Sequence, residues 1–311
     1  MKRLPGILLF IVLQLVLLEL ILSVFFSLHQ DYDAEMWKYT RDLKANVPDA
    51  RGHMHSLLGS AKLMGVNVRT NSLGHRGPEP KPGARHLLVA GDSFTLGWGV
   101  EEEATFSALL RKECPGREVA NLGVGNYNLE QVVAGVEAWG PELNPAAVLY
   151  GFYWNDAEPL QHEPDSWLAR HSHLALFWRK VQVRLLHYGG KPRSFRDYYR
   201  ETYEGESWER FRAAAGRLAA FTKSRGLKLH VVLLPELRTP EDPDIRAVYG
   251  KVETLFRGLG AETLNLFGKL PGVPKPEDYW VAPDDPHPNA AAHREIAAAL
   301  TKSFWPNCKS F

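Results

Sequence analysis

The chain has 311 residues, 45% of them hydrophobic, which is enough for one large domain and an appendage. Lysine and arginine number 37 and aspartate and glutamate 36, so the charge balance gives no case for nucleic acid as a partner. The only cysteines, Cys114 and Cys308, exclude a disulfide scaffold and offer no metal-ligand cluster. They could pair in an oxidising compartment, but we expect free thiols.

The first predicted element is an apolar segment over residues 4–28, long enough as a helix to cross the ~30 Å hydrocarbon layer. Lys2 and Arg3 precede it and Asp31 and Asp33 follow, which predicts a cytoplasmic N-terminus and a periplasmic or extracellular domain. A cleaved signal peptide is the alternative, although its apolar core is normally shorter. We therefore interpret residues 1–30 as a single-pass transmembrane anchor that contacts the membrane through residues 4–28.

Glu19 is the only ionisable side chain within this apolar segment. Carboxylates inside a membrane are costly and usually face a partner or a cavity, so Glu19 could mark a helix partner. Alternatively, Glu19 stays neutral or lies close enough to one interface to remain hydrated.

Residues 31–85 form a linker and N-terminal extension of mixed composition. Alternation over Val66, Val68 and Thr70 predicts an edge strand, and residues 71–77 are typical of a turn. His75 and Arg76 in this turn could reach a substrate, but we expect a solvated turn.

Strands and helices alternate over residues 86–306, which predicts one domain built on a parallel sheet covered on both faces. The expected strands are His86–Ala90, Glu118–Leu122, Ala146–Phe152, Leu227–Leu234 and Glu262–Leu266. The expected helices are Thr105–Glu113, Leu129–Trp139, Trp208–Ser224, Asp244–Leu259 and Asn289–Phe304. Residues 307–311 form a tail.

Residues 157–206 interrupt this alternation, because they carry no strand signal and are too long for an ordinary connection. We interpret them as an insertion that acts as a lid or shapes the substrate site. Residues 160–200 contain eight basic and three acidic side chains, with apolar residues at helical spacing. This pattern suits either a packed helix with solvated charges or a lid that meets anionic lipid or an acidic glycan.

The predicted strand at residues 86–90 runs directly into Gly91-Asp92-Ser93. In open α/β sheets the functional loops lie at the carboxyl ends of the strands. Ser93 would therefore stand at the rim of the sheet, where a nucleophile belongs. Taken alone, Ser93 could equally be a helix cap.

Three later segments offer the groups that a serine nucleophile needs. The loop over residues 121–128 is rich in Gly and Asn and could turn a backbone N–H toward an oxyanion, and Asn155 could add a side-chain amide. Near the C-terminus, His287 could act as the base, with Asp284 to orient it and Asp285 as the alternative orienting residue. Each feature could also be an ordinary turn or cap.

Together these motifs resemble the four blocks of the SGNH/GDSL hydrolase superfamily, in the family's order, over roughly residues 86–305. The blocks are Gly91-Asp92-Ser93, then the 121–128 loop, then Gly151-x-x-x-Asn155-Asp156 with two extra residues, and finally Asp284-x-x-His287-Pro288. In the second block the family's oxyanion glycine falls on Asn126, with Gly123 or Gly125 as the alternatives.

The resemblance implies a flavodoxin-like α/β/α sandwich with a five-stranded parallel sheet, without metal or cofactor. It implies that Ser93 attacks an ester carbonyl, that His287 moves the proton and that Asp284 orients His287. The Ser93 N–H, an N–H near Asn126 and the Asn155 amide would stabilise the oxyanion.

Water as the acyl acceptor would make the protein an esterase or acyl hydrolase acting on an ester-bearing glycan, a lipid or a small molecule. A glycan hydroxyl as the acceptor would make it an O-acyltransferase. The third alternative is a non-catalytic anchored scaffold or assembly factor that keeps the fold.

Overall fold

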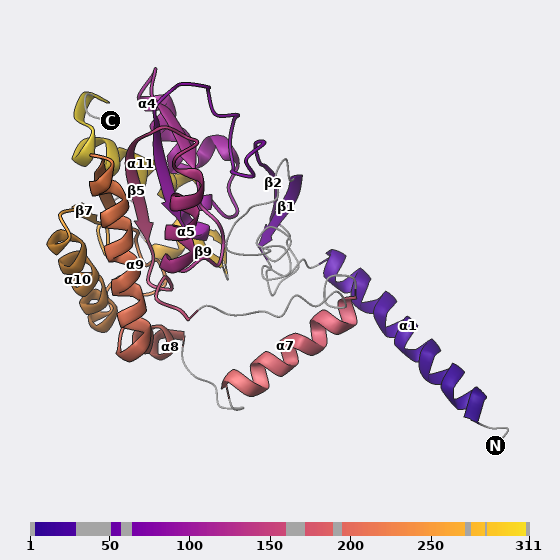
Figure 1. Cartoon of the computed structure of the whole chain (residues 1–311). Coiled ribbons are helices and arrows are strands. Elements are labelled where there is room, and N and C mark those ends of the chain that lie inside the picture. The colour runs from indigo at the N-terminus through magenta and orange to yellow at the C-terminus, as the bar shows by residue number, and fades with distance from the viewer. Residues whose placement is uncertain are drawn as a thin grey trace.

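The computed structural model describes residues 4–28, 51–56, 64–159, 172–188, 195–270, 275–283 and 285–308. A five-stranded parallel sheet forms the centre of the domain, in the order β4-β3-β5-β6-β7 (Figure 1). Its strands are β3 (His86–Gly91), β4 (Glu118–Asn121), β5 (Pro145–Phe152), β6 (Lys228–Leu233) and β7 (Glu262–Asn265). The five strands expected from the sequence are thus present, with bounds that differ by one residue or less.

Helices cover both faces of this sheet, as the alternation of elements requires (Figure 1). The helices on one face are α5 (Leu129–Trp139), α9 (Gly205–Ser224) and α10 (Pro243–Gly258), and those on the other are α4 (Phe106–Glu113) and α11 (Ala290–Phe304). The expected three-layer α/β/α sandwich is therefore confirmed.

The position of β3 in the sheet explains both its composition and the place of the site. Every residue of β3 is buried, because strands pack on each side of it and helices cover both faces. The chain leaves β3 toward β4 on one side and later returns as β5 on the other. In a sheet of this order, ligands bind at the carboxyl ends of the two strands where the direction reverses, and Ser93 lies at that point.

The helix α1 (Leu4–Leu28) extends away from the domain (Figure 1). Its stretch Pro5–Val24 is long and apolar enough to cross a membrane, and none of that stretch is buried inside the protein. The N-terminal extension also contains β1 (Arg51–Ser56) and β2 (Met64–Arg69), which form a separate antiparallel pair. The strand expected around Val66 is therefore present, paired with β1.

The turn that follows β2 is buried, which contradicts our expectation of a solvated turn. His75 and Arg76 are only 3% and 2% exposed. Asn71 accepts hydrogen bonds from the backbone N–H groups of Leu73 and His75, and Arg76 bridges to Asn121 at the end of β4. These contacts fold the turn against the rim of the main sheet.

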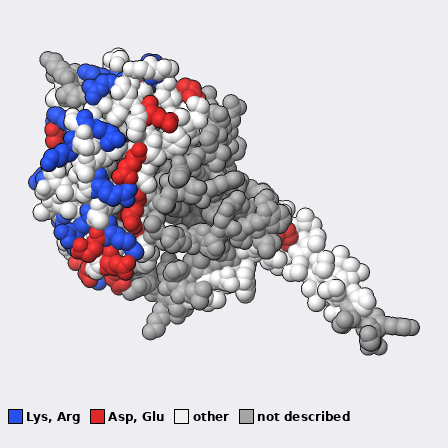
Figure 2. Space-filling model, viewed as in Figure 1, with Lys and Arg blue, Asp and Glu red and all other residues white. Residues whose placement is uncertain are grey.

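The described part of the insertion is helical, with α7 (His173–Tyr188) and α8 (Phe195–Thr202). Residues 160–171 and 189–194, and the side chains of Arg179, Lys180 and Arg184, lie outside the described residues. On the face shown in Figure 2, basic and acidic side chains of the described residues are interspersed, without a patch of one sign.

Cys114 and Cys308 form a disulfide with their Cα atoms 5.4 Å apart, so our expectation of free thiols is wrong. The two residues are 194 positions apart in the sequence. They meet because Cys114 ends α4, and Cys308 closes a short turn after α11, which packs beside α4.

We expect reduction of this disulfide to lower the free energy of unfolding by about 2–5 kcal/mol, because the bond closes a very long loop in the unfolded chain. Denaturant unfolding with and without dithiothreitol measures the difference. The matched control is the double variant Cys114→Ala/Cys308→Ala, on which the reductant should have no effect. Equal midpoints for the oxidised and reduced wild-type protein would contradict the prediction.

Candidate active site

The turn between β3 and the short helix α3 (Ser93–Leu96) presents Ser93 at the rim of the sheet. Asp92 caps α3 by accepting a 2.9 Å hydrogen bond from the Phe94 N–H. Gly97 ends α3 in the left-handed conformation, at φ 83°. A Cβ atom at Gly91 would lie 2.2 Å from Thr95 Oγ1, so this tight turn requires glycine.

Ser93, His287 and Asp285 form a continuous hydrogen-bonded chain. Ser93 Oγ lies 3.0 Å from His287 Nε2, and His287 Nδ1 contacts Asp285 Oδ1. Because a carboxylate can only accept, we assign the proton of the neutral imidazole to Nδ1. His287 Nε2 is then free to accept the Ser93 proton. This is the geometry of an activated serine nucleophile.

The carboxylate contact that we expected of Asp284 is made by Asp285, which the sequence analysis kept as the alternative. The structure forms a hairpin here, of β8 (Trp280–Ala282) and β9 (Asp285–Pro288). In a strand, side chains two positions apart lie on the same face. Asp285 and His287 therefore point the same way, whereas Asp284 lies outside the described residues.

Trp98 is a further partner of this carboxylate that the sequence analysis missed. Its indole Nε1–H donates to Asp285 Oδ2 over 3.0 Å, and the His287 backbone N–H donates to Oδ1 over 3.0 Å. Burial acts to raise the pKa of Asp285, but the His287 charge and these hydrogen bonds outweigh it and lower the pKa. Asp285 is thereby held as a carboxylate.

Apolar packing holds the β8–β9 hairpin against the turn that carries Ser93. Val281 and Ala282 of β8 join Leu96, Trp98 and Val100 in one buried cluster, which also includes Val68 of β2. A Cβ atom at Gly99 would lie 2.9 Å from Val281 Cγ1, so glycine permits this close approach. The N-terminal extension thus helps to hold together the two segments that carry Ser93 and His287.

The structure of the loop after β4 reduces the number of candidate residues for the backbone oxyanion donor expected there. The Gly123 N–H donates to Asn121 Oδ1 over 2.9 Å and is therefore engaged. A Cβ atom at Gly123 would lie 2.3 Å from the Leu96 nitrogen, so this glycine serves close packing against α3. Asn126 has φ 59°, a left-handed conformation that a glycine or an asparagine adopts readily. Asn126 therefore adopts a backbone conformation that glycine also adopts, and Asn126 and Gly125 both remain candidate donors.

Asn155 lies close to Asp92, because its side chain acts to lower the pKa of that carboxyl. Burial raises the pKa of Asp92 to about 6, opposed by the Phe94 N–H, by His287 and by Asn155. Burial and the Asp92 charge also raise the pKa of the fully buried Asp156 well above its usual range. Two such carboxyls repel each other when both are ionised, so this part of the site favours keeping one of them protonated.

Phe94 and Tyr153 form an apolar wall beside these groups. Their rings stack with centroids 3.9 Å apart, and the Phe94 ring lies 5.2 Å from that of His287. Tyr153 is held by its hydroxyl, which donates to the buried Glu236 over 2.5 Å. Tyr153 directly follows the end of β5, and Phe94 comes three residues after the end of β3. This position after a strand end is the sequence signal that could have identified both residues.

Arg76 supports the turn that carries Ser93 through hydrogen bonds to backbone carbonyl oxygens. Its Nη1 donates to the carbonyl oxygens of Leu96 at 3.0 Å and Gly97 at 2.6 Å, and its Nη2 donates to that of Val100 at 2.6 Å. Burial lowers its pKa to about 10, opposed by Glu102, Glu101 and Glu103, so it stays charged at neutral pH. Arg76 therefore braces the turn and does not face solvent.

We expect Arg76→Gln to lower the free energy of unfolding by about 2–4 kcal/mol, because it leaves buried carbonyl oxygens without donors. Turnover should fall with it, since Trp98 lies within the braced segment. Arg76→Lys keeps the charge but offers a single ammonium group, so it should recover only part of the loss. Thermal unfolding and ester turnover measure both effects, and full stability of Arg76→Gln would contradict the role.

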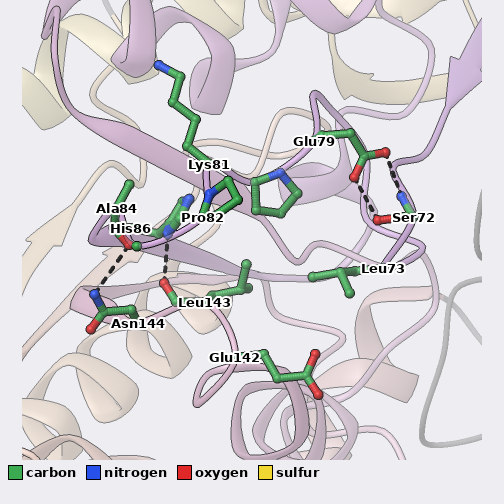
Figure 3. Close-up of a pocket in the computed structure, with 12 residues that line it drawn as sticks. Ser72, Leu73, Glu79, Lys81, Pro82, Ala84, His86, Glu142, Leu143 and Asn144 are labelled. Atoms are coloured by element: carbon green, nitrogen blue, oxygen red, sulfur yellow. Dashed lines mark hydrogen bonds between the residues drawn. The ribbon is translucent and has the colours of Figure 1, made fainter.

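The structure also has a cavity of about 250 Å³ (Figure 3), and neither Ser93 nor His287 is among the residues that line it. It is lined by His86, the first residue of β3, and by Leu143 and Asn144, which precede β5. These are the amino ends of strands whose carboxyl ends carry Ser93 and Asn155. His86 Nδ1 contacts the Leu143 carbonyl over 2.7 Å and thus belongs to the packing of this end. The cavity is therefore not part of the candidate active site.

The strand order and the positions of the motifs along it confirm the resemblance to the SGNH/GDSL hydrolases that the sequence indicates. No protein-family model matches the chain, and no curated protein matches it in sequence.

Similar solved structures do exist. TesA is 16% identical with a TM-score of 0.48, over 71% of this chain and 99% of TesA. A lipolytic G-D-S-L family protein from Veillonella parvula is 12% identical with a TM-score of 0.43, over 72% and 100% of the two chains. A mutant of Axe2, an acetyl-xylooligosaccharide esterase from Geobacillus, is 16% identical with a TM-score of 0.47, over 72% and 96%.

Proposed function

We propose that this chain is a membrane-anchored serine esterase or acyl hydrolase of the SGNH/GDSL type. The observation that carries the proposal is the chain of contacts from Ser93 Oγ through His287 to Asp285. Isolated serine, histidine or carboxylate side chains are common, but this order of contacts at the carboxyl end of a central strand suits nucleophilic acyl transfer.

In the proposed reaction, His287 Nε2 takes the Ser93 proton as Oγ attacks the ester carbonyl carbon. The tetrahedral intermediate collapses, His287 returns the proton to the leaving alcohol, and the acyl group stays on Ser93. His287 then takes a proton from the water that attacks the acyl-enzyme, and returns it to Ser93 Oγ as the bond to the acyl group breaks and the carboxylic acid leaves. Asp285 stays ionised and stabilises the imidazolium, which its lowered pKa supports.

We assign stabilisation of the oxyanion to the Ser93 N–H, the Asn126 N–H and the Asn155 amide. Each of these residues follows a different strand of the central sheet: Ser93 follows β3, Asn126 follows β4 and Asn155 follows β5. One substrate carbonyl oxygen at the rim of the sheet can therefore face all three donors. Donors fixed before the reaction stabilise the developing charge without reorganising. The left-handed backbone of Asn126 and the closeness of Asn155 to Asp92 support the assignment.

For the location, we propose that α1 is an uncleaved anchor and that the domain lies in the periplasm or outside the cell. The apolar stretch Pro5–Val24 and the Cys114–Cys308 disulfide support this, because disulfides persist in oxidising compartments. The mature protein should keep its N-terminus and stay with membranes through an alkaline wash. A mature N-terminus near Gln30 would instead identify a signal peptide.

The catalytic proposal is tested by labelling with a fluorophosphonate, which reacts covalently with activated serines. The wild-type protein should be labelled, whereas Ser93→Ala should not, and Ser224→Ala on α9 serves as the matched surface control. A panel of acetyl and longer acyl esters, with and without sugar acceptors, then separates hydrolysis from transfer. Absence of labelling in the folded wild-type protein would favour the non-catalytic scaffold.

A further inference from the structure

Glu19 of α1 caps the N-terminus of α7. Its Oε1 accepts a 2.7 Å hydrogen bond from the His173 N–H and lies 3.1 Å from His173 Nδ1. Its Oε2 accepts from Ser172 Oγ at 2.7 Å and from the Leu174 N–H at 3.0 Å. A carboxylate at this position satisfies N–H groups that a helix leaves unpaired and complements the helix dipole. The contacts therefore fix the start of α7 to one point on α1.

The helix α7 exposes large apolar side chains along one side. Phe177, Trp178 and Leu185 are 45%, 59% and 60% exposed, and their spacing places them on one helix face. Outside α1, the only other exposed large apolar side chain among the described residues is Leu259, at 37%. An exposed apolar stripe of this kind indicates a surface that contacts something apolar.

The position of Glu19 on α1 indicates which apolar environment the exposed stripe of α7 contacts. Glu19 precedes Val24, the end of the most apolar stretch, by five residues and Leu28, the end of α1, by nine, or roughly 7–14 Å along the helix. Amphipathic helices that lie on membranes bury their apolar face about 5–10 Å below the head groups. The helix α7 starts beside α1 and extends away from it at a wide angle (Figure 1), so a bilayer crossed by α1 would meet α7 near its surface.

We infer that α7 lies in the outer interface of the lipid bilayer, docked on α1 by Glu19, with Phe177, Trp178 and Leu185 among the lipid chains. The inference rests on the proposed anchoring by α1. By sequence, the same helix also carries Arg179, Lys180 and Arg184. Basic side chains beside an apolar stripe favour anionic phospholipid head groups, so the partner is a bilayer that contains them.

The test uses the full chain in bilayers of phosphatidylcholine and phosphatidylglycerol that carry nitroxide quenchers at a shallow or a deep position. A fluorescent label is attached to Trp178→Cys, with Arg179→Cys as the matched control at the adjacent position of α7. Lys223→Cys, exposed on α9, reports the domain surface, and Val16→Cys reports the anchor. Turnover of a short soluble ester is measured in the same samples.

The label at position 178 should lose most of its fluorescence to the shallow quencher, and the labels at 179 and 223 should lose little. Glu19→Ala should reduce the quenching at 178 and leave that at 16 unchanged; unchanged quenching at 178 would overturn the docking by Glu19. Equal quenching at 178 and 223, with the anchor label still quenched, would overturn the inference. Loss of quenching at 16 would instead overturn the anchor, and loss of turnover alone would overturn only the proposed catalysis.

Discussion

Replacing Ser93 by alanine should lower kcat for ester hydrolysis on the order of 10⁶-fold, to the level left by binding and the oxyanion donors alone. The expected size of the effect follows from the geometry, in which Ser93 Oγ is the atom that faces His287 Nε2. The side chain is small and only 3% exposed, and its hydroxyl does not hold the turn together, so the variant should fold normally. Stopped-flow or long-incubation assays with an activated ester measure the loss.

The double variant Ser93→Ala/His287→Ala distinguishes a shared mechanism from two separate effects. If the serine and histidine act as one unit, His287→Ala alone should be about as severe, and the double variant little worse than either single variant. Clearly additive losses would contradict the proposed mechanism. Ser224→Ala should keep full activity, and the thermal unfolding of each variant identifies any loss that reflects folding.

The central sheet and the position of Ser93 could be predicted from the sequence because both depend on local patterns. The buried run at Leu87, Leu88 and Val89 is continuous, as a parallel strand covered on both faces requires. Its termination at Gly91-Asp92-Ser93 places the serine at the end of that strand, whatever the packing elsewhere. Asn155 follows from the same reasoning at the end of β5.

The contact of Asp285 with His287 could not be predicted, because it depends on a hairpin that the sequence pattern does not indicate. Pro283, Pro286 and Pro288 suggest an irregular loop, and proline is unfavourable inside most strands. The pairing of β8 with β9 becomes favourable only because Val281 and Ala282 pack on the nucleophile turn. In a strand alternate side chains share one face, so Asp285 lies on the same face as His287. A loop would not impose this relation.

The disulfide, the role of Arg76 and the contact between Glu19 and α7 all join segments that are distant in sequence. Cys114 and Cys308 meet only once α4 and α11 lie on the same face of the sheet. Arg76 was expected in solvent because its neighbours are typical of a turn, and its acceptors are backbone carbonyls, which leave no sequence signal. Local patterns identify elements, whereas these contacts depend on how the elements pack.

Asp285→Asn should lower kcat by about 10³–10⁴-fold, whereas Asp284→Asn should lower it by less than about tenfold. An asparagine at 285 has a single accepting oxygen, so it keeps the hydrogen bond from Trp98 or the one from the His287 backbone N–H, but not both. It cannot stabilise the imidazolium, and an amide that donates to His287 Nδ1 would favour the tautomer with the proton on Nε2. That tautomer cannot accept the Ser93 proton.

Trp98→Phe is the matched control for this comparison, because it removes one hydrogen bond to Asp285 and keeps the carboxylate and most of the packing. We expect a loss of about tenfold, since the carboxylate stays ionised but is held by one donor fewer. Measured kcat values at constant pH rank the three variants. A loss in Asp284→Asn as large as that in Asp285→Asn would show that the histidine takes its partner from position 284 during turnover. A small loss in both would mean that neither carboxylate orients His287, and that His287 acts with Ser93 alone.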